Sequence, residues 1–166
     1  MPSTKLAVAS LLALAIAANA QDLRPASTPP KEQQSYAFTP DLGDIMAVMQ
    51  LRHLKLAFAG SLENWNLADY EVAEMRKSFE ATAKLYPEFD SIPVAKLINS
   101  VSEPALKKVE EAVRTKNFAA FAASLKNLTA ACNSCHQSSN VGFIVIRVPT
   151  SSPFSNQVFA PLQDKH

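Results

Sequence analysis

Residues 117–137 read NFAAFAASLKNLTAACNSCHQ, and this stretch decides the fold. Asn117 is a favourable residue for the N-cap of a helix. From there, apolar side chains and cysteines recur every three or four residues, at Phe118, Phe121, Leu125, Leu128, Cys132 and Cys135. This spacing puts them on one face of an α-helix. The pattern therefore predicts a long amphipathic helix that begins at Asn117 and continues towards Gln137.

Upstream, residues 41–60 contain the first of three further amphipathic patterns. Pro40 and Asp41 favour the start of a helix, and Gly60 favours its end. A mostly apolar stripe recurs at steps of three or four residues, formed by Leu42, Ile45, Met46, Met49, His53, Leu56, Ala57 and Gly60. We therefore predict a first helix over residues 41–60, with this stripe turned inwards.

Two more helices are predicted between residues 64 and 113. The second begins near Asn64 and ends before Pro87, because a residue that precedes proline is disfavoured in the helical region. Its expected inner face consists of Leu67, Tyr70, Met75, Phe79 and Ala83. Residues 93–99 form a turn or two, and Ser102 then caps a third helix with Pro104 in its first turn. The apolar positions of this third helix are Leu106, Val109 and Val113.

Four amphipathic helices joined by short links predict an all-α fold, an antiparallel four-helix bundle over residues 41–140. Signals for β-strands are confined to Val141–Val148, which is too little for a sheet. Proline crowds residues 21–40 and recurs in the tail at residues 149, 153 and 161. We therefore expect an extended leader over residues 21–40 and an extended C-terminal tail over residues 141–166.

Residues 1–20 have the pattern of a secretory signal peptide. Lys5 is followed by the apolar run LAVASLLALAIA at residues 6–17, and Ala18-Asn19-Ala20 provides small residues for cleavage. A membrane anchor is the alternative, but about a dozen apolar residues are fewer than the ~20 that span a bilayer. We expect cleavage after Ala20, export to the periplasm and no membrane span in the mature chain.

Composition excludes several classes of function. The chain has 166 residues, with 16 Lys and Arg against 15 Asp and Glu, so a net charge of +1 gives no basic field for nucleic acid. Its 3 glycines cannot form a glycine-rich phosphate loop, and its 2 cysteines cannot form a disulfide framework. We therefore expect neither nucleic-acid binding nor a nucleotide-binding loop.

The chemistry lies in Cys132-Asn133-Ser134-Cys135-His136. The spacing C-x-x-C-H is the attachment sequence of c-type haem, in which each thiol adds to one vinyl group of the porphyrin and the histidine binds the iron. A disulfide, a thioredoxin-like redox pair and a zinc site are the alternatives. The thioredoxin-like pair needs a βαβ unit that the sequence lacks, and zinc needs further ligands in a chain with 3 histidines. Export favours haem, because c-type haem is attached outside the cytoplasm.

An exported chain whose last helix carries CNSCH resembles the cytochrome c prime superfamily of monohaem four-helix bundles. Arg52 followed by Gly60 also fits a spacing in the first helix of that family. The resemblance covers about residues 41–140 and implies one haem c per chain, thioether bonds to Cys132 and Cys135, and His136 as the proximal iron ligand. It further implies Arg52 near a haem propionate and Leu56 on the distal face, and it allows a homodimer through the first two helices. The leader and the tail depart from this family.

The distal side of the iron separates the candidate functions. Met46, Met49 and His53 lie on the same stripe, at the level of His136 in an antiparallel bundle. His53 is the favoured sixth ligand, since imidazole suits iron, whereas Met49, Met46 or an open site are the alternatives.

These residues predict a periplasmic monohaem c-type cytochrome that transfers single electrons to a redox partner protein and is not an enzyme. The main alternative is a five-coordinate haem protein that binds or senses nitric oxide or carbon monoxide. A weak peroxidase would need an open iron with His53 as the acid–base group. A fourth hypothesis gives haem a mainly structural role in a partner-binding bundle.

Overall fold

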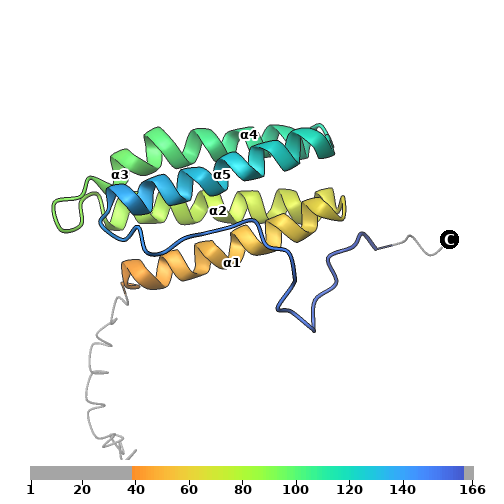
Figure 1. The fold of residues 1–166 in the computed structure, drawn as a ribbon, viewed down its shortest axis with the longest axis horizontal. Coiled ribbons are helices and arrows are strands. Elements are labelled where there is room, and N and C mark those ends of the chain that lie inside the picture. Colours follow the sequence, from red (N-terminus) through yellow and green to blue (C-terminus); the bar gives the residue numbers. More distant parts are fainter. Residues whose placement is uncertain (1–38, 163–166) are drawn as a thin grey trace, which may run out of the picture. The chain divides into compact units, whose positions relative to one another are not determined.

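The computed structural model describes residues 39–162, so the predicted signal peptide and nearly all of the predicted leader lie outside the described residues. The chain there is helical (Figure 1), and the all-α prediction is confirmed. Its elements are α1 (Leu42–Ser61), α2 (Trp65–Leu85), α3 (Val94–Leu97), the π-helical turn η1 (Ile98–Ser102), α4 (Glu103–Arg114) and α5 (Phe118–Ser138). Residues 39–162 contain no strand, only an isolated bridge between Phe89 and Ile92.

The three long helices α1, α2 and α5 begin where polar side chains cap them. Asp41, Asn64 and Asn117 each accept a hydrogen bond from a backbone N–H in the first turn, at 2.7, 3.2 and 3.0 Å respectively. Such a bond satisfies one of the four N–H groups that the start of a helix leaves unpaired. The predicted starts of these three helices are thereby confirmed.

The predicted start of the third helix, at Ser102, is wrong. Ser102 has helical backbone angles, φ −78° and ψ −46°, and makes no capping hydrogen bond. Instead, α3, η1 and α4 form one continuous helical run, with a single π-helical turn in the middle. Because a π-turn contains an extra residue, it shifts the face that the following residues present.

The predicted inner face of α2 is wrong at one position. Tyr70 is exposed, and the next residue, Glu71, is buried. An ion pair explains the burial of this carboxylate, because Arg52 of α1 lies 3.1 Å from it. The other predicted positions lie inwards: Met75 and Phe79 are buried, and Leu67 and Ala83 are half-buried.

Helices α1, α2, α4 and α5 pack side by side around one apolar core. Helix α1 contacts α2, α2 contacts α4, α4 contacts α5, and α5 contacts α1 (Figure 1). Gly60 allows the last of these contacts, since a Cβ added there would lie 2.0 Å from Cζ of Phe121. The largest enclosed apolar side chains are Phe121, Leu56, Met75, Leu106, Leu128, Val72 and Val109.

After α5, residues 139–162 continue as a tail without helix or strand. The tail returns along the molecule, because Phe159 packs against Phe58 of α1 with ring centroids 5.5 Å apart. Asn64 at the start of α2 donates to the backbone oxygens of Phe159 and Ala160, at 3.0 and 3.3 Å. The tail thus runs from the end of α5 to the α1–α2 connection (Figure 1). Among residues 39–162, no helix combines the length and the apolar character needed to cross a membrane.

Candidate functional site

The CNSCH motif forms the end of α5. Cys132 and Cys135 are three residues apart on this helix, so they lie on the same side of it. Both are free thiols and half-buried. His136 follows in the same turn and is also half-buried. The two thiols and the imidazole can therefore meet one planar group.

A cavity of about 600 Å³ lies beside these three residues. Its size falls within the roughly 300–1,000 Å³ that small-molecule and cofactor sites occupy. The first turns of α1 also line the cavity, and η1 contributes Ile98 and Ser102. Most of the lining is apolar, including Met46, Met49, Phe79, Val94, Ile98, Ile144 and Ile146. The donor set and the apolar lining fit a covalently attached haem.

The orientation of His136 is fixed by the tail. Its Nδ1 lies 2.7 Å from the backbone oxygen of Ile144. A carbonyl oxygen can only accept, so Nδ1–H of His136 donates and Nε2 carries the free lone pair. Histidines that bind a metal through Nε2 usually make this second hydrogen bond, which fixes the ring and its tautomer.

Both thiols are in an environment that favours their protonated form. Burial, together with the smaller effect of the neighbouring Cys135, raises the pKa of Cys132 from 9.0 to about 11. Burial also raises the pKa of Cys135. In a reactive C-x-x-C redox pair the pKa is lowered instead. The site therefore resembles an apolar attachment surface more than a thiol–disulfide exchange centre.

The structure places His53 away from the cavity lining. Its Nε2 lies 2.8 Å from Oγ1 of Thr129, and its side chain is buried between α1 and α5. The hydroxyl of Thr129 donates its own hydrogen to the backbone oxygen of Leu125 at 2.8 Å. Thr129 can thus only accept from His53, so Nε2 of His53 carries the proton. In this arrangement Nε2 has no lone pair to offer to iron.

Arg52 and Leu56 are not part of the lining either. Arg52 forms ion pairs with Glu71 at 3.1 Å and with Glu74 at 3.3 Å, both on α2. Its guanidinium also lies over the ring of Tyr70, 5.8 Å from the centroid. Leu56 is fully enclosed in the core. Of the predicted site residues, Cys132, Cys135 and His136 therefore lie together at the cavity. Arg52, Leu56 and His53 lie outside its lining.

The α1 residues that line the cavity are Leu42, Gly43, Met46, Ala47, Met49 and Gln50. Met49 is buried, whereas Met46 is half-buried. Among the described residues, no group of three or more His, Cys, Asp or Glu side chains is arranged to hold a metal ion. If a haem were bound here, its porphyrin would supply most of the ligands to the iron, and the chain would need to add only one histidine and one thioether.

Sequence reasoning missed the part of the tail that lines the cavity. Ile144 and Ile146 belong to the lining, and Asn133, inside the motif, is hydrogen-bonded to the tail. The available signal was the apolar run at residues 141–148, which predicted strand character.

Comparison with known proteins identified no matching protein-family model, no similar curated protein and no similar solved structure.

Proposed function

We propose that this chain is an exported monohaem c-type cytochrome that transfers single electrons, with haem c attached to Cys132 and Cys135. One observation carries the proposal: Cys132, Cys135 and His136 line the same apolar cavity, and Nδ1–H of His136 is committed to Ile144. When bound, the haem supplies a one-electron ferric/ferrous couple.

The residues of the chain have distinct roles in this proposal. Cys132 and Cys135 hold the porphyrin covalently, and His136 binds iron through Nε2. The hydrogen bond to Ile144 increases the basicity of the ring and keeps it in one orientation. The apolar lining excludes water, and this burial contributes to the reduction potential.

The arrangement of the helices is part of the same proposal. We infer an antiparallel four-helix bundle, which is supported by the closed cycle of contacts α1–α2–α4–α5 and by the short links between α1 and α2 and between α4 and α5. In such a bundle the start of α1 lies beside the end of α5. This agrees with a cavity lined by Met46 of α1 and His136 of α5.

For the sixth position we propose Met49 in preference to His53. Met49 already lines the cavity, and its thioether is a known ligand of haem iron. His53 could bind only after giving up its hydrogen bond to Thr129 and changing its tautomer or its rotamer. A His/Met pair raises the potential relative to a bis-His pair, which suits an electron carrier.

Acid–acetone extraction tests the covalent attachment. Haem should stay with the polypeptide purified from an exporting host, and the intact mass should correspond to a chain that begins at Gln21. Free pigment in the extract would contradict the proposal. A chain that retains residues 1–20 would contradict the predicted cleavage after Ala20 alone.

Near-infrared magnetic circular dichroism tests the sixth ligand, because bis-His and His/Met haems give charge-transfer bands at different wavelengths. Met49→Leu conserves volume and should cost less than about 1.5 kcal/mol of stability. It should nevertheless abolish the low-spin signal, while His53→Gln should keep it. Loss only in His53→Gln would reassign the ligand to His53. A high-spin wild type that binds carbon monoxide readily would favour the gas-binding alternative.

A further inference from the structure

Asn133, the first of the two residues between the cysteines, is hydrogen-bonded to the tail in both directions. The backbone N–H of Ile146 donates to Oδ1 of Asn133 at 2.8 Å. Nδ2–H of Asn133 donates to the backbone oxygen of Ile146 at 2.9 Å. The side-chain amide thus pairs with the tail as the backbone of a neighbouring strand would. Both groups are part-buried, which protects the pair from water.

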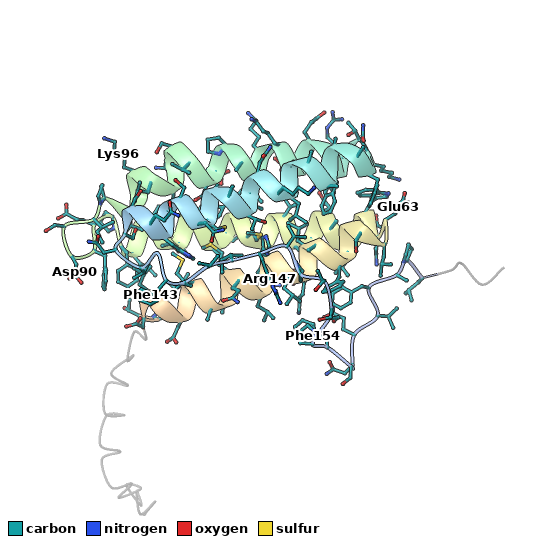
Figure 2. All side chains as sticks on the ribbon, in the orientation of Figure 1. Glu63, Asp90, Lys96, Phe143, Arg147 and Phe154 are labelled. Carbon is teal, nitrogen blue, oxygen red and sulfur yellow. The ribbon has the colours of Figure 1, made fainter. Side chains whose placement is uncertain are left out.

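This pairing lies directly beside the hydrogen bond that orients His136. Ile144, whose backbone oxygen accepts from Nδ1–H of His136, is two residues before Ile146. The segment that contains both isoleucines has no helix or strand to fix it (Figure 2, where Phe143 and Arg147 flank it). Its backbone is tied nearby by the N–H of Val141, which donates to the backbone oxygen of His136 at 3.0 Å. The N–H of Ile144 itself donates to the backbone oxygen of Val141 at 2.9 Å. Asn133 supplies a further tie, on the other side of Ile144.

We propose that Asn133 is a positioning residue, which clamps Ile146 so that the oxygen of Ile144 stays on Nδ1 of His136. The inference rests on the proposed function in so far as His136 binds iron. Asn133 itself touches neither iron nor porphyrin in this role. It acts by holding the acceptor that selects the tautomer and orientation of the ligand.

The chemistry of the side chain explains why asparagine suits this position. Its amide is a donor and an acceptor at the same time, and both groups form hydrogen bonds with the backbone of Ile146. Aspartate could accept from the N–H of Ile146 but could not donate to its carbonyl. Alanine could do neither. Ser134, the other residue between the cysteines, is exposed and provides a matched control on the same turn.

The test compares Asn133→Ala, Asn133→Asp and Ser134→Ala as full-length haem-loaded proteins. Hydrogen exchange of the Ile146 amide reports on the clamp. Solvent exchange of the Nδ1 proton of His136, measured by ¹⁵N NMR of the reduced protein, reports on the orienting bond. We expect Asn133→Ala to accelerate both by about tenfold or more, the factor that two hydrogen bonds of ordinary strength carry. Asn133→Asp should give intermediate rates, and Ser134→Ala should match the wild type.

The midpoint reduction potential is a further measurement, because a purely structural role of Asn133 would not predict that its loss raises the potential. Loss of the bond from His136 to Ile144 makes the imidazole a weaker donor, so the midpoint potential should rise in Asn133→Ala. Faster exchange at Ile146 with an unchanged rate at His136 would overturn the proposal, since the clamp would then act only on the tail. Unchanged rates at both positions would also overturn it.

The proposal can still be tested if a variant does not fold or if no haem is bound. If Asn133→Ala yields no folded protein, the comparison of Asn133→Asp with Ser134→Ala decides, and equal rates at His136 would overturn the proposal. If the wild type carries no haem, the proposed function fails, yet both exchange rates can be measured in the haem-free chain. Coupled acceleration there would support the clamp without the cytochrome.

Discussion

Lowering the pH should destabilise this protein through His53. Burial lowers the pKa of His53 from its ordinary value of 6.5 to about 4. Between these two values the unfolded chain binds the proton and the folded chain does not, so stability falls as the pH falls. The gap between 6.5 and about 4 amounts to about 3 kcal/mol at roughly 1.36 kcal/mol per pH unit.

The perturbation that isolates this effect is His53→Gln, because glutamine keeps a polar partner for Thr129 but does not titrate. Urea unfolding of both proteins, measured at several values between pH 7 and pH 4, gives the free energy of unfolding at each pH. Carboxylates contribute equally to both proteins, so their contribution cancels in the difference. The wild type should lose about 3 kcal/mol more than the variant over this interval.

Parallel curves for the two proteins would refute the reasoning. They would mean that His53 takes up its proton in the folded state as readily as in the unfolded state, which a dry environment between α1 and α5 does not allow. A steeper curve for the variant would also refute it.

Three further predictions concern the site and the packing around it. In the proposed cytochrome, His136→Ala should keep the covalently bound haem but lose the native Soret band and part of the thermal stability; an unchanged band would contradict the proposal that His136 binds the iron. Gly60→Ala should lower the free energy of unfolding by about 1–3 kcal/mol, because the new Cβ would lie 2.0 Å from Phe121. Adding Phe121→Leu should recover part of that loss. If the changes in free energy of unfolding of the two single variants simply add in the double variant, the steric contact between residues 60 and 121 is contradicted. Arg52→Ala should cost about 3 kcal/mol in urea unfolding by leaving the Glu71 carboxylate buried and unpaired, with an unchanged visible spectrum. A spectral change without loss of stability would instead favour the propionate role.

The helices could be predicted because their signals are local. The capping residues Asp41, Asn64 and Asn117 act on N–H groups two or three residues away, so the sequence alone contains both partners. Ser102 followed by Pro104 has the same local signal, yet the helix passes through it without a cap. Packing of Ile98 and Ser102 against the rest of the protein outweighed that preference.

The placement of the site residues on α1 could not be predicted from periodicity alone. Met49 and His53 are four residues apart on one stripe, but the stripe is wide enough to face both the cavity and α5. Met49 meets the cavity, whereas His53 meets Thr129. Which of the two lies beside the motif depends on the rotation of α1 about its axis. That rotation is set by distant contacts, such as Arg52 with Glu71 and Gly60 with Phe121.

The tail has a consequence for the order in which the protein folds. The helix pairs α1–α2 and α4–α5 join neighbours in sequence and close early, whereas Asn64 meets the tail across 95 and 96 residues. Closing so large a loop is entropically costly, and few apolar side chains besides Phe159 offset that cost. The tail therefore docks last and opens first, in local fluctuations short of global unfolding. Because Ile144 and Ile146 form part of the cavity lining, that side of the cavity remains accessible until the tail docks, after the helices have assembled.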